Sequence, residues 1–333
     1  KVEKLQTALH AKAKQSPNYR FYALYDKVHR VDVLAHAYRL CRVNNGSPGV
    51  DGQTFTDIEE YGVGKWLDEL AEELKSRTYQ PQAVRRVMIP KPNGQERPLG
   101  IPTVKDRVVQ TATLLVLEPI FEADFQPEQY AYRPGKSAHS ALERIKTLIR
   151  SGHEEVVDAD LSGYFDSIPH VELLKSVARR VSDKHLLHLI KMWLVAPVEE
   201  TDERGHKRRT TRNKDEKQGA PQGAPISPLL ANLYMRRFVL GWKVLGHEQR
   251  LHAKIVNYAD DFVICCHRGK GAAALATMRL MMERLKLTVN AEKTHLCSLP
   301  EETFDFLGYT FGRLWSYRTG APYYGMRPSV KAT

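Results

Sequence analysis

The sequence predicts an α+β fold, because segments with helical periodicity and short apolar strands follow each other without a regular alternation. Two observations support this class. The first 80 or so residues carry apolar side chains at helical spacing, whereas the later chain contains apolar runs only a few residues long. The chain has 333 residues and 42% hydrophobic residues, which suffices for two or three subdomains with a sizeable core.

The N-terminal region is expected to be helical. Leu34, Ala37 and Cys41 share one helical face, and Leu67 with Leu70 begin a similar stripe further on. A turn-rich stretch, NNGSPGVDG, separates the two.

A hairpin and a long helix should come next. Residues 84–89 suit a strand, and Asn93-Gly94 is a strong hairpin turn signal. Thr103 is expected to cap the following helix, with Asp106 three residues later completing a capping box.

The remaining elements are shorter. The segment 199–217 mixes both charges and predicts a solvated loop or an extended hairpin, whose cations could also contact nucleic acid. A strand-turn-strand is expected around YADD at 258–261, and the end of the chain suggests short strands and an irregular Gly/Pro-rich tail. The other predictions are helices over 137–150, 170–194, 224–242 and 271–286, and a strand near 155–160.

Charge and composition narrow the function. The net charge of +11 favours a nucleic-acid partner, because Lys and Arg neutralise phosphates, although a merely basic soluble protein would look the same. No apolar run approaches the roughly 18 residues of a membrane span, and the N-terminus resembles no signal peptide. The first residue is Lys, so the sequence is expected to be an excerpt of a longer product. The four cysteines show no zinc or disulfide spacing and are expected to be reduced thiols in the cytosol.

The stretch YADDF places Asp260 and Asp261 side by side between apolar runs. Two carboxylates at one tight turn repel each other unless a cation neutralises them, and carboxylate oxygens suit Mg²⁺. The alternative is a plain Asp-Asp turn on the surface. Asp160 follows another apolar strand, and a strand-end Asp together with a hairpin Asp pair can hold two metal ions about 4 Å apart. That arrangement serves nucleotidyl transfer.

Several stretches in order resemble reverse transcriptases encoded by group II introns. The palm motifs are matched by DADLSGYFDSI, QGAPQGAPISPLLANLY, YADD, LTVNAEKTHL and FDFLGYTF, and the fingers motifs by IPKPNGQERPLGIPTVKDRVVQ and YAYRPGKSAHSAL. NNGSPGVDG is similar to the N-terminal extension of that branch. The resemblance covers nearly everything from about residue 40 to the end.

The resemblance implies a right-hand polymerase fold whose palm carries a small antiparallel sheet packed on helices. The implied divisions are a helical N-terminal extension at 1–84, fingers at 85–157 and a palm at 158–333 that includes the charged insertion 199–217. The thumb that follows in full-length relatives is expected to be absent from this chain.

The resemblance also implies roles for individual residues. Asp160, Asp260 and Asp261 are the expected catalytic metal ligands, joined by the main-chain carbonyl of Leu161, with two Mg²⁺ ions for which Mn²⁺ could substitute. Phe165 is the expected steric gate beneath the incoming sugar, which favours deoxynucleotides; without the resemblance it could equally be a core residue.

Substrate contacts complete the expected site, although any one of these residues alone would more often be a solvated or core side chain. The incoming nucleotide is expected to meet Lys91, Arg97, Gln222 and Lys293. Template and primer are expected to meet Tyr132, Arg133, Lys136, Gly308 and Tyr309.

The expected function is RNA-directed DNA polymerase, with an RNA template, a DNA or RNA primer and deoxynucleotides as substrates. A structured intron RNA and CRISPR adaptation proteins are the further expected partners, with no membrane. The parent is expected to be a mobile intron protein, or a domesticated or CRISPR-associated relative, in the bacterial cytoplasm with RNA or the nucleoid. The alternatives are an RNA-binding splicing cofactor (maturase) with an idle polymerase site, and an RNA-dependent RNA polymerase, which Phe165 and YADD disfavour.

Overall fold

The computed structural model describes all residues except 91–93, 95, 203 and 331–333. The chain forms two compact units, each assembled from two stretches of sequence. Unit 1 comprises Lys1–Asp124 and Phe165–Leu233, and unit 2 comprises Phe125–Tyr164 and Tyr234–Thr333. Two helices, α8 (Tyr164–Ser167) and α12 (Ser227–Val244), contain the points at which the chain passes from one unit to the other.

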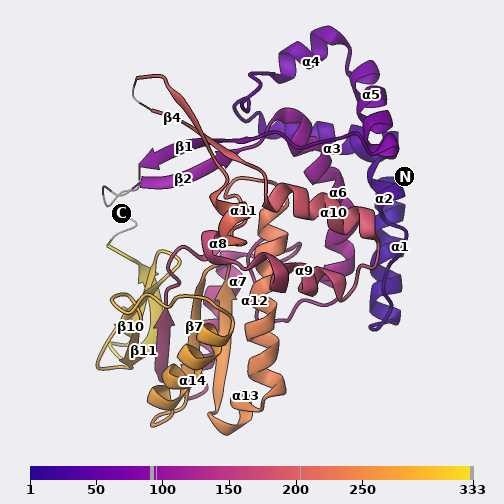
Figure 1. Ribbon diagram of the computed structural model, residues 1–333. Helices are drawn as coiled ribbons and strands as arrows, with labels where there is room; N and C mark the ends of the chain where they lie inside the picture. Colours follow the sequence, from indigo (N-terminus) through magenta and orange to yellow (C-terminus); the bar gives the residue numbers. More distant parts are fainter. Residues whose placement is uncertain (91–93, 95, 203, 331–333) are drawn as a thin grey trace. The chain divides into compact units, whose positions relative to one another are not determined.

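Unit 1 surrounds the long helix α6 with other helices (Figure 1). Its N-terminal helices pack against α6, whose residues are buried over most of its length. The helices of this unit are α1 (Val2–Gln15), α2 (Tyr25–Val28), α3 (Val31–Asn44), α4 (Phe55–Tyr61), α5 (Val63–Ser76), α6 (Val104–Glu122), α9 (His170–Ala178), α10 (Lys184–Leu194) and α11 (Arg212–Glu216).

Unit 1 also contains a four-stranded sheet in the order β2-β1-β4-β5. The expected hairpin is confirmed, because β1 (Val84–Pro90) pairs antiparallel with β2 (Glu96–Ile101) up to Pro90 opposite Glu96. The charged segment forms the extended hairpin of β4 (Val198–Thr201) and β5 (Lys207–Thr210). Strand β4 then adds to β1 in parallel, a pairing between segments far apart in sequence.

The capping box expected at the start of α6 is half right. Thr103 Oγ1 accepts from the N–H of Asp106 at 3.0 Å, but the Asp106 carboxylate reaches elsewhere. It accepts from the Tyr79 hydroxyl at 2.5 Å and from the N–H of Gln82 at 3.1 Å. Trp193 donates to the same hydroxyl. A buried polar network therefore joins α6 to the segment that precedes β1 and to α10. Burial raises the pKa of Asp106.

Unit 2 is built on a second four-stranded sheet, in the order β6-β7-β3-β8. Its strands are β3 (Glu155–Ala159), β6 (Ala253–Tyr258), β7 (Asp261–Cys266) and β8 (His295–Ser298). All pairings in this sheet are antiparallel, and α7 (Ala138–Arg150) and α14 (Gly271–Arg284) pack against its strands. A short helix, α13 (His247–Arg250), precedes β6.

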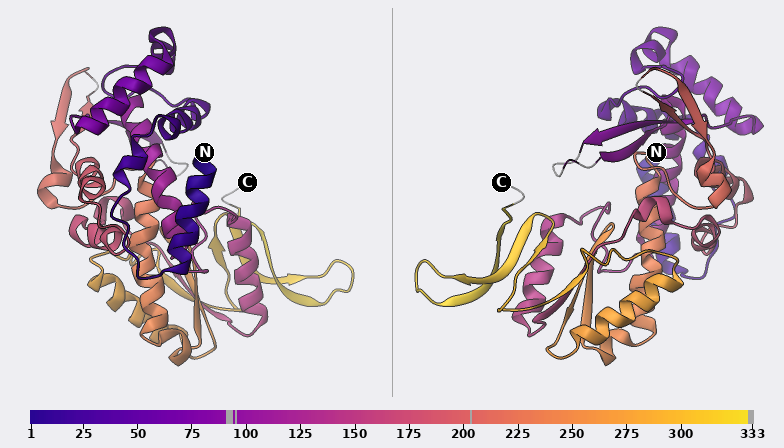
Figure 2. Two further views of the ribbon diagram at one scale, coloured as in Figure 1. Left: turned by 90° about the vertical axis from the view of Figure 1, so that its right-hand side faces the viewer. Right: turned by 60° about the vertical axis from the view of Figure 1, so that its left-hand side comes forward.

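A three-stranded sheet closes unit 2, with β10 (Tyr309–Trp315) between β9 (Phe304–Phe306) and β11 (Pro322–Pro328). The expectation of an irregular tail is wrong, because β11 pairs with β10 from Tyr309–Pro328 to Trp315–Pro322. Figure 2 shows these two strands extending as a long hairpin away from α7. The helix expected from residue 224 begins at Ser227 instead, and the segment 170–194 divides into α9 and α10.

Within the described residues, no helix is long and apolar enough to cross a membrane. All four cysteines are buried and free.

Candidate active site

The YADD turn joins β6 to β7 through a two-residue loop. Tyr258 pairs with Asp261, so Ala259 and Asp260 form the loop itself. Ala259 has a φ of +58°, a left-handed conformation that costs a non-glycine residue on the order of 1 kcal/mol. This geometry places Asp260 and Asp261 at the turn, at one edge of a sheet whose strands are mostly buried.

Asn257 holds this turn from inside the sheet. Its side chain is fully buried, and Nδ2 donates to the carbonyl oxygens of Ala259 at 2.8 Å and of Asp261 at 3.4 Å. Its backbone is also bound, because its N–H donates to Glu128 O and its carbonyl accepts from the N–H of Tyr130, both at 2.9 Å. Sequence reasoning missed this residue. The available signal was a lone amide in the apolar run IVNY.

Strand register brings Asp160 to the same edge. Ala159 pairs with Phe262 in the β3–β7 ladder, so the next residue, Asp160, comes opposite Asp261 when that register continues. Asp158 pairs with His295 in the β3–β8 ladder, so the register on that side leads to Lys293. The Lys293 ammonium lies 3.6 Å from Asp160 Oδ2, which agrees with this placement.

The backbone around Asp160 is fixed by the segment before β8. Its N–H donates to Thr294 Oγ1 at 3.2 Å, and its carbonyl accepts from the N–H of Asn290 at 2.9 Å. Leu161, whose carbonyl is a predicted metal ligand, forms an isolated bridge with Val289, and its side chain is buried. These bonds hold Asp160 and Leu161 in one defined position.

The carboxylates at this edge influence one another. Desolvation raises the pKa of Asp261 to about 7, and the charges of Asp260, Asp160 and Asp158 act in the same direction, while Lys293 lowers it. An oxygen-rich cluster that resists ionisation fits a hard divalent cation. Among the described residues, however, no three His, Cys, Asp or Glu side chains are gathered into a finished metal-binding group.

Unit 1 holds the predicted nucleotide contacts that come from the hairpin and from the QGAPQGAP motif. Arg97, which is exposed on β2, donates from Nε to Gln222 Oε1 at 3.3 Å. The N–H of Gly100 donates to Gln222 O at 2.6 Å, so this motif is bound to β2. Phe165 has a buried side chain, and its carbonyl accepts from the N–H of Ala220 at 2.8 Å. Lys91 lies outside the described residues.

The predicted template contacts in unit 2 differ in exposure and in bonding partners. Tyr132 is more than half exposed, with a φ of +53°. Arg133 Nη1 donates to the carbonyls of Gln126 and Gln129, both at 2.7 Å, and the Lys136 ammonium lies 4.9 Å from the ring centroid of Tyr130. The Arg133 guanidinium therefore also shapes the loop that carries it.

The predicted primer grip lies at the turn between β9 and β10. Leu307 and Gly308 both have positive φ, of 48° and 80°, between the paired residues Phe306 and Tyr309, as a two-residue type I′ turn requires. Tyr309 is partly buried against the hydrophobic core of unit 2.

Comparison with known proteins assigns the family. The family model described as reverse transcriptase (RNA-dependent DNA polymerase) matches residues 89–311. The chain therefore belongs to the reverse transcriptase family, and it has the right-hand polymerase fold that this family implies, with mixed helices and small sheets. Enzymes of this family use divalent metal ions.

Two of the similar proteins are named for introns. Protein YkfC of Escherichia coli is 33% identical over 344 residues, which cover 92% of this chain and 87% of that protein. Group II intron-encoded protein LtrA of Lactococcus lactis is 35% identical over 230 residues, which cover 67% of this chain and 36% of LtrA. Nuclear intron maturase 2 of Arabidopsis thaliana is 38% identical over 114 residues, 34% of this chain and 15% of that protein. The chain is thus an RNA-directed DNA polymerase by family that is similar to a group II intron-encoded protein, and it spans about a third of LtrA.

Proposed function

We propose that this chain extends a primer 3′-hydroxyl on an RNA template by two-metal nucleotidyl transfer. The observation that supports the proposal is the register of β3 with β7, which brings Asp160 toward Asp261 and the YADD turn. These carboxylates and the Leu161 carbonyl would hold two Mg²⁺ ions, with Mn²⁺ as a substitute. When bound, such ions activate the attacking hydroxyl and stabilise the leaving pyrophosphate.

The residues of the chain position the reactants. Lys293, paired with Asp160 here, is a cation suited to the leaving phosphate, and Arg97 with Gln222 would contact the incoming nucleotide. These side chains would act by positioning the reactants and by electrostatic stabilisation, as in phosphoryl transfer generally. Template and primer would contact Tyr132, Arg133, Lys136, Gly308 and Tyr309. Of these, Arg133 also binds the carbonyls of its own loop.

The domain assignment follows the same resemblance. We assign residues 1–84 to an N-terminal extension, 85–157 to fingers and 158–333 to a palm with a small antiparallel sheet packed on helices. The start of the family match at residue 89 supports the first boundary. The bacterial relatives support a site of action with RNA in the bacterial cytoplasm.

A second function has its own support. Similarity to a protein named as an intron maturase favours binding of a structured intron RNA, alongside polymerisation or in place of it. Partnership with CRISPR adaptation proteins finds no support among the relatives described above, whose names point to introns where they name a context.

The sugar preference tests the polymerase type. Wild-type protein should extend a primer on an RNA template with deoxynucleotides and poorly with ribonucleotides. Phe165→Val should lower the ratio of kcat/KM for the two sugars by about tenfold or more, because a smaller side chain relieves the clash with a 2′-hydroxyl. The matched control is Phe55→Val, which alters another buried Phe of unit 1. An unchanged ratio in Phe165→Val would remove Phe165 as the gate, and a wild-type preference for ribonucleotides would contradict DNA synthesis.

A further inference from the structure

The hairpin of β10 and β11 has an unusual surface. From Tyr309 to Val330 the sequence contains three arginines and no Asp or Glu. Trp315, Tyr317 and Tyr323 are exposed, at 64%, 107% and 45%. Large aromatic rings gathered on an exposed, basic element usually mark a binding surface, because leaving them in water is unfavourable.

Tyr323 is held in place before any ligand arrives. It pairs with Leu314 on β10, and strand alternation puts Tyr323, Gly325 and Arg327 on one face. A Cβ atom on Gly325 would lie 2.8 Å from Tyr323 Cε2 and 2.7 Å from Leu314 Cδ1. The glycine therefore leaves the space that the Tyr323 ring edge occupies beside the strand. A ring fixed in this way loses little rotamer freedom on binding.

Two arginines of the hairpin lie near this ring: Arg327 is on the same strand face as Tyr323, and Arg313, which pairs with Tyr324 on the other face, lines a pocket with it. In the described part of the chain, no carboxylate lies within ion-pair distance of Arg313, Arg318 or Arg327, although many other basic residues are paired. A pocket of about 170 Å³ is lined by Arg313, Pro322, Tyr323 and Tyr324. Guanidinium groups bind phosphates and stack on flat rings, so their charge is available to a polyanion.

The geometry points to a binding site for single-stranded nucleic acid on this hairpin, outside the carboxylate site. One base stacks on the Tyr323 ring, while Arg313 and Arg327 contact the flanking phosphates. Aromatic rings that alternate with cations are the means by which proteins bind single strands without reading their sequence. A protein partner would also use Tyr, Trp and Arg, but residues 309–330 carry arginines and no Asp or Glu of their own, which favours a polyanion.

The test compares two oligonucleotides of equal charge. Fluorescence anisotropy with labelled twelve-nucleotide oligouridylate, and with an abasic sugar-phosphate twelve-mer, separates stacking from phosphate attraction. The buffer contains EDTA and no nucleotide, so no extension occurs; the Tyr323 and Gly325 variants report on the hairpin, and the extension assay decides the polymerase function separately. Wild-type protein should bind the uridylate about tenfold more tightly than the abasic strand, since one stacked base contributes about 1–3 kcal/mol.

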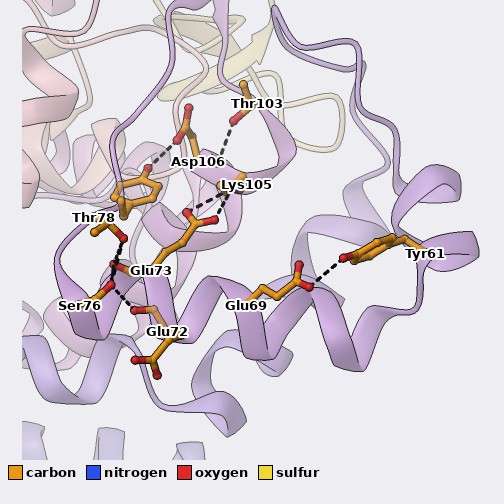
Figure 3. Close-up of polar contacts among 10 residues, drawn as sticks. Tyr61, Glu69, Glu72, Glu73, Ser76, Thr78, Thr103, Lys105 and Asp106 are labelled. Carbon is orange, nitrogen blue, oxygen red and sulfur yellow. Dashed lines mark hydrogen bonds and ion pairs between the residues drawn. The ribbon is translucent and has the colours of Figure 1, made fainter.

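Two variants should abolish this contrast, the difference in affinity between the uridylate and the abasic strand, by different routes. Tyr323→Ala removes the ring. Gly325→Ala adds a methyl group that displaces the Tyr323 ring, and the backbone at residue 325 tolerates alanine. Tyr323→Phe should keep the contrast, because it keeps the ring. Tyr61→Ala is the matched control, since Tyr61 is similarly exposed, at 49%, but lies on α4 and bonds Glu69 (Figure 3).

Salt dependence tests the arginines. Arg327→Gln should reduce the slope of log K against log salt by about 0.7, the value for one phosphate contact with a single strand. Equal affinity of wild type for both oligonucleotides, or a full contrast in Tyr323→Ala and Gly325→Ala, would overturn the inference. Self-association that Tyr323→Ala abolishes, without uridylate binding, would also overturn it and make the hairpin a protein contact.

Discussion

The side chain of Asn257 binds the carbonyl of Ala259, the residue whose left-handed backbone forms the turn that carries Asp260. The same residue is bound through its backbone to the segment from Glu128 to Tyr130, which precedes Tyr132 and Arg133. One buried amide therefore supports the turn of the predicted catalytic carboxylates and connects it to the loop predicted to contact the template.

Loss of this amide should impair catalysis more than folding. Asn257→Ala removes both turn contacts and should lower the single-turnover rate of nucleotide incorporation by about 10–100-fold, because small displacements of reacting groups have effects of that size. Unfolding free energy should fall by about 1–3 kcal/mol, since buried carbonyls lose their donor. The measurement pairs rapid-quench kinetics with thermal melting. An unchanged rate at saturating nucleotide, with a lower melting temperature, would make Asn257 a purely structural residue.

The raised pKa of Asp261 predicts a pH-dependent stability in the metal-free protein. A carboxyl whose folded pKa is about 7, against an ordinary 3.8, favours folding fully below pH 3.8 and loses that contribution as pH rises through 7. Asp261→Asn stays neutral, so in EDTA it should melt above wild type at pH 8 by about 2–4 °C, after allowance for solvent screening. At pH 4 the two proteins should melt alike.

The control for this titration is Asp68→Asn, which changes an exposed carboxylate of α5. Its melting temperature should follow wild type at both pH values. A constant difference between Asp261→Asn and wild type from pH 4 to pH 8 would show that Asp261 titrates normally.

Arg97 and Gln222 should act together on the incoming nucleotide. Each single change to alanine should raise the KM for deoxynucleotide by about tenfold, because a charge-assisted contact contributes about 1.5–3 kcal/mol. The double variant should cost less than the sum of the two, since the Arg97 Nε–Gln222 Oε1 bond couples them. Steady-state kinetics on one template measures all four proteins. Strict additivity, or an unchanged KM in Arg97→Ala, would contradict a shared contact.

Local chemistry predicted much of this fold. Thr103 caps α6, and the predicted hairpin is present as the pair β1 and β2, although Asn93 of its turn lies outside the described residues. Turn and cap rules need only a few neighbouring residues. The sequence could not place the Asp106 carboxylate on Tyr79 or pair β4 with β1, since both depend on segments distant in sequence. The sequence also predicted an irregular Gly/Pro-rich tail where the structure has β11, in which Gly325 makes room for Tyr323.

The candidate site was predictable to a similar degree. Motif order pointed to Asp160, Asp260 and Asp261, and strand register brings Asp160 and Asp261 to the same edge. Asn257 was missed because its role depends on a turn geometry that sequence patterns do not specify. The metal, the nucleotide contacts and the gate at Phe165 remain predictions.

The most direct test of the central claim is primer extension on an RNA template with Mg²⁺ and deoxynucleotides, comparing wild type with Asp260→Ala/Asp261→Ala. Filter binding of the same template-primer runs in parallel, and circular dichroism verifies folding. The carboxylate account predicts DNA product from wild type alone, with similar RNA binding by both proteins. Tight RNA binding by wild type without any DNA product would contradict it and favour a splicing cofactor with an idle site.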